Sequence, residues 1–302
     1  MKHKRTTVVL SVLIMVMIAA GVLAQRGFRG GGLGRGRGGG FGRGGFNFES
    51  AETAREIPQH GNQTPTWTNA PGFEKDVFTF ARVKRGRAFD GSGGTWWTDV
   101  PDSDLNLSYR LQWVTSMKVN PDGRFLHLTD KELADYPFIY MVEPGTLYLA
   151  DEEVVALRKY LLNGGFLMLD DFWGDYEWQI MERELKKVFP DRRFVELPLD
   201  HPLYHCVFDI NSKGQVPNVN LGTASQWNGG ITWESNHQGD VRTVHHKVIF
   251  DDKGRIMVMA THNTDNGDGW EWEGDNPYFF EHFSEKISYP LAVNIIFYQM
   301  TH

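Results

Sequence analysis

Residues 161–174 read Leu-Leu-Asn-Gly-Gly-Phe-Leu-Met-Leu-Asp-Asp-Phe-Trp-Gly, and this stretch decides the fold. The Gly pair at 164 and 165 predicts the end of a helix. The apolar run that follows predicts a short buried strand, which ends in two carboxylates, Asp170 and Asp171. A buried parallel strand that ends in charge is typical of an open α/β sheet, whose ligand sites lie at the carboxyl ends of its strands. The stretch therefore predicts both the fold class and the place of a site.

The sequence on both sides of this stretch continues the alternation of strands and helices. Apolar residues spaced by three and four positions predict helices, and short apolar runs bounded by Gly, Pro or Asp predict strands. Residues 203–240 are rich in Asn, Gly and Gln and predict a loop-rich insertion. Because parallel crossovers place helices on both faces of a sheet, we expect a three-layer, mostly parallel, doubly wound α/β fold. The expected strands are 77–83, 137–142, 165–169, 194–197, 244–250 and 255–261, and the expected helices are about 104–117, 151–163, 175–188 and 289–300.

Three segments precede this domain, which we place at residues 76–302. Residues 1–24 combine a basic start with an apolar run and small residues before position 25, which predicts a signal peptide. An uncleaved membrane anchor is the alternative. Residues 25–46 are Gly/Arg-rich and predict a disordered cationic tether, and residues 47–75 form a polar lead-in. We therefore expect an exported, periplasmic or envelope-associated protein, anchored in the inner membrane if the first segment is kept.

The charge of the chain is unevenly distributed. Eight of its 31 Lys and Arg residues and none of its 38 acidic residues lie in residues 1–46, so residues 47–302 carry a net charge of −15. An acidic body disfavours nucleic acid as a specific partner and is compatible with neutral glycans, cations or basic partners. We expect membrane contact only through the N-terminal segment. Cys206 is the only cysteine, so no disulfide forms within the chain, and an inert thiol is expected.

Polar and aromatic residues follow several of the expected strands, and loops after parallel strands gather at one edge of a sheet. The flat faces of the tryptophans suit stacking on a sugar, although they could instead fill the gaps between long loops. The expected ligand-binding residues are Arg82, Trp96, Trp97, Asp99, Glu143, Trp173, Asn263 and Trp270.

Asp170 and Asp171, together with His201, are the candidate catalytic residues for acid/base chemistry. Adjacent residues leaving a strand point to opposite sides. We therefore expect one carboxylate to face the site and the other to bind backbone amides at the following turn.

Asp265 and Asp268 lie in an oxygen-rich stretch, residues 263–271, and are candidate ligands of a divalent cation. The match to a calcium loop is poor, because Thr264 stands at its first position and flanking helices are not expected. The alternative is a hydrogen-bonded turn covered by Trp270 and Trp272.

A set of motifs covers roughly residues 76–301: Phe-Ala-Arg at 80–82, Gly-Thr-Trp-Trp-Thr-Asp-Val-Pro at 94–101, Glu-Pro-Gly at 143–145, Asp-Asp-Phe-Trp-Gly at 170–174, Asp-His-Pro at 200–202 and Asp-Gly-Trp-Glu-Trp at 268–272. Together they resemble the bacterial family called domain of unknown function 4159. The resemblance implies a flavodoxin-like or class I glutamine amidotransferase-like α/β layer and no established activity. The amidotransferase nucleophile is a Cys after a core strand, whereas here that strand ends in Asp170 and Asp171 and Cys206 lies elsewhere. Glutaminase activity is therefore disfavoured.

Three functions remain open from the sequence. The first is a binding or regulatory module for a polar envelope ligand such as a glycan, with its site at the carboxyl edge of the sheet. The second is a hydrolase that uses Asp170 or Asp171 with His201, assisted by a divalent cation. The third is a non-catalytic scaffold tethered through the Arg/Gly segment.

Overall fold

A computed structural model describes residues 47–61, 63–72, 76–85 and 96–302. The expected signal peptide and the Gly/Arg-rich tether lie outside the described residues. Among the helices of the described ranges, none combines the length and the apolar character that crossing a membrane requires.

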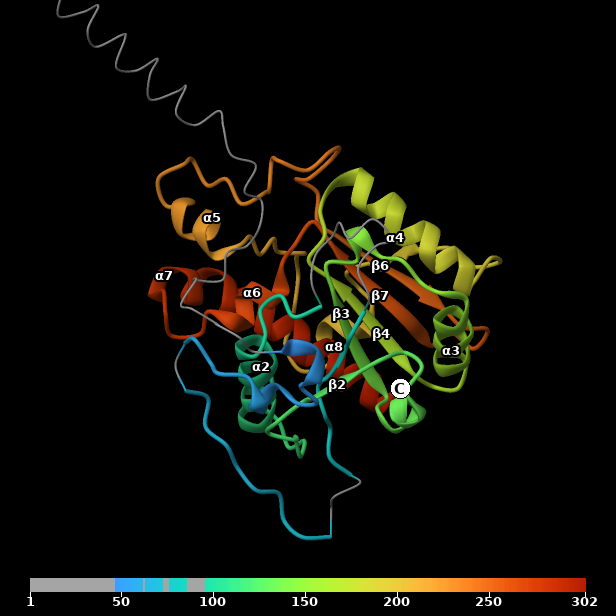
Figure 1. Cartoon of the computed structure of the whole chain (residues 1–302). Helices are drawn as coiled ribbons and strands as arrows, with labels where there is room; N and C mark the ends of the chain where they lie inside the picture. Colours follow the sequence, from blue (N-terminus) through green and yellow to red (C-terminus); the bar gives the residue numbers. More distant parts are fainter. Residues whose placement is uncertain (1–46, 62, 73–75, 86–95) are drawn as a thin grey trace, which may run out of the picture. The chain divides into compact units, whose positions relative to one another are not determined.

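The centre of the domain is a seven-stranded sheet in the order β2-β1-β3-β4-β7-β6-β5 (Figure 1). The neighbouring strands β2, β1, β3, β4 and β7 pair in parallel, and β6 runs antiparallel to both of its neighbours, β7 and β5. The strands are β1 (Ala81–Val83), β2 (Arg124–Leu126), β3 (Phe138–Val142), β4 (Phe166–Asp170), β5 (Val195–Glu196), β6 (His245–Phe250) and β7 (Ile256–His262).

Helices cover both faces of the sheet (Figure 1). Alternate residues of β3 enter different cores, as the pleat of a strand requires. Tyr140 packs in a cluster with residues of α2 (Asp102–Val114) and α8 (Tyr289–Thr301), whereas Met141 packs with residues of α3 (Asp151–Leu162) and α4 (Gly174–Val188). Each large apolar side chain buried in this way contributes roughly 1.5–3 kcal/mol. The expected three-layer, mostly parallel α/β fold is confirmed.

The helices begin and end where their charges favour it. In α4, Asp175 and Glu177 lie in the first turn and Lys186 and Lys187 in the last, which complements the helix dipole. In α3 the first turn holds three acids, and the chain leaves the helix through Gly164, whose φ is 110°. Glycine adopts that left-handed conformation without steric cost.

Several elements differ from the expected ones. The strand expected at 77–83 pairs regularly only from Ala81, and the helix expected to reach 117 ends at Val114. β2 was not expected, because three residues carry too little pattern to be recognised. Helices also occupy parts of the chain read as loop: α5 (Val219–Ala224) lies in the insertion, α6 (Asn266–Glu271) lies in the oxygen-rich stretch, and α7 (Pro277–Phe279) leads into a π-helix, η6 (Phe280–Ser288). The remaining short 3-10 helices are η1 (Phe48–Ser50), η2 (Ala54–Glu56), η3 (Lys131–Asp135), η4 (Pro144–Thr146) and η5 (Pro202–His205).

The segment expected as a polar lead-in contributes to the core. Ala51, Ala54 and Ile57 are buried against Trp96 and Leu105. The apolar residues of this segment are too widely spaced to show a helical or strand period, so their burial is decided by the surface that they meet.

Candidate functional site

The loops at the carboxyl ends of the parallel strands meet at one edge, and their backbone is strained there. Within the described residues, the non-glycine residues with positive φ are Asp99 (64°), Glu143 (50°), Asp171 (57°) and Asn263 (62°). All four belong to the expected site. A left-handed conformation costs an L-residue roughly 1–2 kcal/mol, and such strain gathers where the surroundings require a particular side-chain direction.

Asp170 ends β4 and is completely buried. It accepts hydrogen bonds from Thr261 Oγ1 (2.5 Å), Asn266 Nδ2 (2.8 Å), Tyr140 OH (3.0 Å) and the backbone N–H of Gly267 (3.1 Å). Burial raises the pKa of this carboxyl, and the four donors oppose that rise. With four donors on its two oxygens, Asp170 ties β3, β4, β7 and α6 together and is saturated.

Asp171 follows the last residue of β4 with a left-handed backbone, and its hydrogen-bond partner differs from those of Asp170. Its Oδ1 accepts a hydrogen bond from Trp173 Nε1 at 3.1 Å, so it stabilises the turn that follows β4. Burial raises the pKa of Asp171 well above its usual value, and the charges of Glu143, Asp99 and Glu234 raise it further. Among the described residues Asp171 thus binds the turn through an indole N–H and not through the backbone amides that were expected, and it is also part of a larger group of acids.

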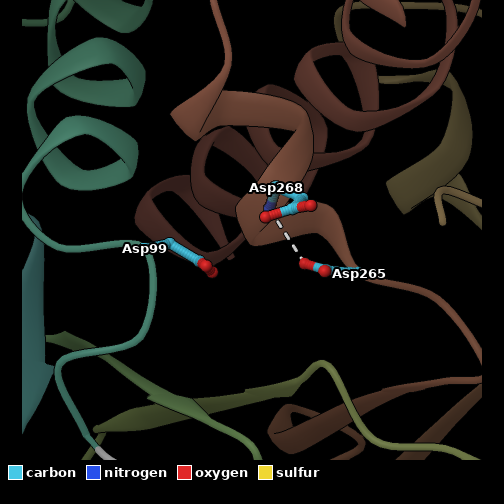
Figure 2. Close-up of side chains that lie close together, drawn as sticks. All are labelled: Asp99, Asp265 and Asp268. Carbon is cyan, nitrogen blue, oxygen red and sulfur yellow. Dashed lines mark hydrogen bonds between the residues drawn. The ribbon is translucent and has the colours of Figure 1, made fainter. Parts of the chain in front are cut away.

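Three further carboxylates come together beside it. Asp99 lies just before α2, and Asp265 and Asp268 lie at the start of α6. One carboxylate oxygen of each can be chosen so that all lie within 4.8 Å of one another. In Figure 2 the three side chains point toward a common space. Asp265 Oδ1 accepts a hydrogen bond from Asp268 N at 2.8 Å and so caps α6. We call Asp99, Asp265 and Asp268 the acidic triad.

The triad retains unused acceptor capacity. Asp268 accepts hydrogen bonds from Val219 N (2.6 Å) and Trp272 Nε1 (3.2 Å). Asp99 Oδ2 is buried without a hydrogen-bond partner among the described residues. It lies over Gly267, where an added Cβ would be only 2.2 Å away. Within the described ranges Asp265 is held through Oδ1 and Asp99 leaves Oδ2 without a partner, whereas both oxygens of Asp268 already accept one hydrogen bond each. Metal-ligating carboxylates are usually oriented by hydrogen bonds of this kind.

Each member of the triad has a pKa raised well above its usual value. Burial is the largest cause in every case. For Asp99 the charge of Asp268 adds to it, and for Asp265 the charge of Asp171 does so. Like charges close together in a buried site disfavour ionisation unless a cation balances them.

The nearby arginines do not pair with the triad. Arg82 is buried and forms an ion pair with Asp104, while its Nη1 donates to the carbonyls of Trp96 and Thr98. Arg85 donates to the carbonyl of Val142 and to that of the next residue. Arg82 thus positions the loop that carries Asp99 and lowers the Asp99 pKa only in part. Within the described ranges, no ion pair reaches Asp99, Asp171, Asp265 or Asp268.

The tryptophans expected to form a platform are mostly interior. Trp96, Trp173 and Trp270 are each at most 2% exposed. Trp96 Nε1 donates to Glu49, a residue of the lead-in, and Trp270 packs on the ring of Tyr140. Trp97 is only partly buried and stacks on the lead-in residue Phe48. The first three rings therefore fill the space between loops and present no face for stacking on a sugar.

Asn263 and Glu143 shape the edge. The Asn263 side chain accepts from Gly174 N and donates to the carbonyls of Asp240 and Thr243, so it fastens the insertion to α4 and β7. Glu143 follows β3, and its backbone N–H donates to the Asp170 carbonyl at 2.9 Å. Its carboxylate is close enough to raise the pKa of both Asp99 and Asp171.

His201 does not lie with these acids. Its ring contacts Tyr298 near the end of α8, whereas the acids lie near the start of that helix, where Ser288 Oγ donates to the carbonyl of Asn266. Ten residues of helix separate Ser288 from Tyr298, or roughly 15 Å at 1.5 Å per residue. General acid/base catalysis needs contact or one bridging water, so His201 is not placed to act with Asp170 or Asp171.

Cys206 is partly buried, and its thiol contacts the carbonyls of Leu203 and Asn294. Burial raises the pKa of this thiol, which favours the unreactive protonated form.

Four residues that contact the site were not predicted as site residues from the sequence: Tyr140, Asn266, Glu271 and His60. Tyr140 was hidden within an apolar strand, and Asn266 and Glu271 lay in the oxygen-rich stretch without a distinguishing pattern. His60 gave no signal in a polar segment far from the sheet in sequence. Only contacts across the fold mark these residues.

The chain belongs to the family described as domain of unknown function (DUF4159), whose model matches residues 79–300. The expected family is thereby confirmed. No curated protein matches the chain.

Proposed function

We propose that the acidic triad binds a divalent cation and, through it, a polar ligand at the carboxyl edge of the sheet. The observation that carries this proposal is the convergence of Asp99, Asp265 and Asp268, whose ligand atoms lie within 4.8 Å of one another. Two segments of the chain more than 160 positions apart supply these carboxylates, so their meeting is a property of the fold.

The ligand set favours a hard cation. All three candidate ligands are carboxylates, which suit Mg²⁺, Mn²⁺ and Ca²⁺ rather than the softer metals that prefer sulfur or imidazole. Asp171 and Glu143 add negative charge nearby, as their effects on the Asp265 and Asp99 pKa values indicate. A doubly charged cation would balance this charge and favour the ionised form of each acid.

The expected polar-ligand module is supported in a modified form. Stacking on Trp96, Trp173 or Trp270 has no support, because those rings are buried. A ligand with hydroxyl, carboxylate or phosphate oxygens could complete the coordination of a cation that holds three protein oxygens. The hydrolase hypothesis with His201 has no support from the geometry, and a scaffold role is what remains if no cation binds.

Thermal unfolding of the full chain tests the proposal. After treatment with a chelator, Mg²⁺, Mn²⁺ and Ca²⁺ are added in turn, and at least one should raise Tm in a concentration-dependent way. A ligand present at 100 times its Kd stabilises the folded state by about 2.7 kcal/mol. Asp265→Asn should abolish this shift while keeping a side-chain oxygen to cap α6.

Asp252→Asn is the matched control, because the Asp252 side chain is 90% exposed and pairs only with Arg192 among the described residues. The proposal fails if none of the three cations shifts Tm, or if both variants respond as the unaltered protein does.

We also propose that the chain is exported, on the basis of the basic and apolar composition of residues 1–24. Fractionation of cells that express the full chain checks this: the protein should be found in the envelope or periplasmic fraction, and its presence only in the cytoplasm would contradict export.

A further inference from the structure

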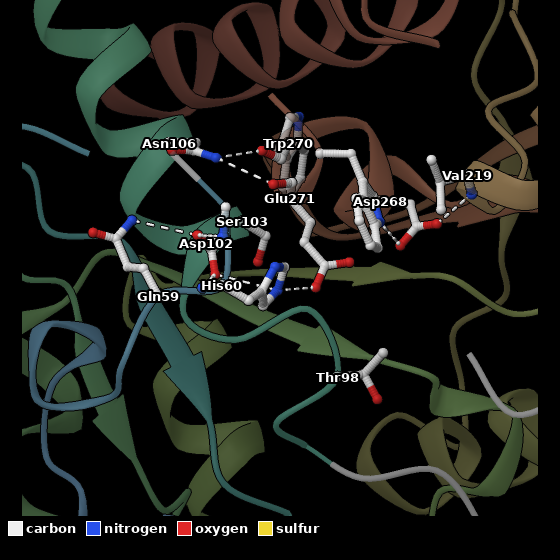
Figure 3. A network of polar contacts seen from close by, with 12 residues as sticks. Gln59, His60, Thr98, Asp102, Ser103, Asn106, Val219, Asp268, Trp270 and Glu271 are labelled. Atoms are coloured by element: carbon white, nitrogen blue, oxygen red, sulfur yellow. Dashed lines mark hydrogen bonds and ion pairs between the residues drawn. The ribbon is translucent and has the colours of Figure 1, made fainter. Parts of the chain in front are cut away.

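His60 connects the lead-in to two buried acids. Its Nε2 lies 2.6 Å from Glu271 Oε1 and 3.2 Å from Asp102 Oδ2 (Figure 3). Asp102 and Glu271 are 0% and 4% exposed. Ionised carboxylates only accept hydrogen bonds, so Nε2 is the donor between them. The imidazole therefore bridges the start of α2 and the end of α6.

The lead-in is fastened around this bridge. The backbone N–H groups of His60 and Gly61 donate to the two oxygens of Asp102, and Gln59 Nε2 also approaches Asp102. Asn106, one turn later in α2, donates to the carbonyls of Trp270 and Glu271. His60 thus occupies a fixed position between two helices that are themselves joined.

From this position His60 reaches the acidic triad through α6. Its ring lies against the indole of Trp272, with 5.5 Å between the centroids. The Nε1 of that indole donates to Asp268 Oδ1 at 3.2 Å. On its other side His60 holds Glu271, which lies three positions after Asp268 and so on the same face of α6. The Trp272 route ends in a hydrogen bond to the Asp268 carboxylate, and the Glu271 route ends beside it, close enough for the Glu271 charge to raise the Asp268 pKa.

We propose that His60 is a positioning residue of the cation site, which orients Asp268 by fixing Glu271 and Trp272. This inference rests on the proposed function. It makes the lead-in part of the site, although the family match begins only at residue 79. Outer contacts of this kind matter because a ligand that is free to rotate loses affinity for its metal.

Calorimetric titration of the full chain with MnCl₂ tests the assignment. His60→Ala should weaken Mn²⁺ binding by about tenfold or more, the effect typical of losing an outer contact to a metal ligand. His60→Gln keeps an N–H donor of similar reach and should recover part of that affinity. If His60→Ala does not fold, the comparison of His60→Gln with the unaltered chain decides the question.

Arg55→Ala is the matched control. Arg55 fastens the same segment through the carbonyls of Thr64 and Pro121 and an ion pair with Asp122, and these contacts do not include the acids of the site. It should lower Tm while leaving Mn²⁺ affinity unchanged.

The two proposals fail differently. Unaltered protein that binds no Mn²⁺, Mg²⁺ or Ca²⁺ would overturn the cation site and the role of His60 with it. Unaltered protein that binds Mn²⁺, with His60→Ala retaining full affinity, would overturn the role of His60 alone; if His60→Ala does not fold, full affinity in His60→Gln would do the same. Equal losses of affinity in His60→Ala and Arg55→Ala would reduce His60 to a general anchor of the lead-in.

Discussion

An aspartate lies at the end of β4 and another just beyond the end of β7, but the two carboxylates have different surroundings. Asp170, at the end of β4, receives four hydrogen bonds from side chains and backbone. Asp265, just beyond β7, accepts one from the backbone of Asp268 and faces other carboxylates. A buried carboxylate surrounded by donors stabilises the fold, whereas buried carboxylates close to one another either take up a proton or need a bound cation to balance their charge. The comparison therefore separates a structural acid from a binding site at the same edge.

Removing the charge at the end of β4 should have the largest effect. Asp170→Asn places an amide N–H₂ among four donors and leaves some of them unsatisfied. We expect a loss of roughly 3 kcal/mol in the free energy of unfolding, as for other broken buried networks. Urea unfolding of the full chain in the presence of a chelator measures it. A loss below about 1 kcal/mol would contradict the structural role of Asp170.

The same change at the end of β7 should have the opposite sign. In metal-free protein, Asp265→Asn removes one of several repelling charges and keeps the helix cap, so we expect a gain of roughly 1 kcal/mol, within the range of other relieved charge repulsions. The same urea series measures it beside Asp170→Asn. A loss of stability similar to that of Asp170→Asn would mean that the two ends are alike.

A glycine tests the geometry of the triad without changing its charge. Gly267→Ala would bring a Cβ to 2.2 Å from Asp99 Oδ2 and push that carboxylate aside. We expect cation affinity to fall by about tenfold, the order of effect that displaced ligand contacts produce. Titration with MnCl₂ measures it.

Gly165→Ala is the control for that variant, because its Cβ would meet the Tyr160 ring at 2.3 Å just before the start of β4, at the opposite end of that strand from Asp170. It should cost stability and leave Mn²⁺ affinity intact. Equal affinities in both variants would show that the position of Asp99 does not matter.

The smallest expected effect concerns His237, a positively charged side chain near the turn that follows β4. His237 lies between Glu177 and Glu234, and Glu177 also accepts from the backbone N–H of Trp173. Burial lowers the pKa of His237, but the two glutamates outweigh it and raise the pKa to about 9. The pKa of His237 in the folded protein lies above the unfolded value of 6.5. The interaction of protonated His237 with the two glutamates therefore stabilises the protein fully below pH 6.5, and this contribution is lost as the pH rises through about 9.

His237→Gln should therefore lower Tm at pH 6, and the difference from the unaltered chain should shrink by pH 9.5. Tm measured across this range in chelator-treated protein checks the slope. A difference that does not change with pH would mean that the His237 charge does not contribute.

Much of the fold could be predicted because its signals are local. Amphipathic spacing and terminal charges mark α3 and α4, and continuous apolar runs mark β3, β4 and β7. β2 and α6 were missed for different reasons. β2 is too short to show a period, and in α6 two glycines and two acids within six residues argue against a helix that the Asp265 cap and the surrounding contacts stabilise.

The site was predicted in outline but not in its roles. Asp99, Glu143, Asp171 and Asn263 were expected at the edge and do lie there, each with a left-handed backbone. Trp96, Trp173 and Trp270, which suggested a platform, are core residues, since an indole is large and its burial is more favourable than its exposure. His201 was grouped with the acids because it follows a strand, but the chain turns away toward the end of α8.

The sequence by itself determined which residues reach the edge, because the end of a strand and the sign of a side chain are both readable locally. Only the tertiary structure decided which of these carboxylates receive enough hydrogen bonds to balance their burial and which do not. That difference depends on donors from remote segments: Tyr140 and Asn266 reach Asp170, and His60 meets Glu271 from 211 positions away. A hydrogen bond needs two groups in contact, and charge repulsion is strongest between near neighbours, so both depend on which residues lie close in space and not on their order in the chain.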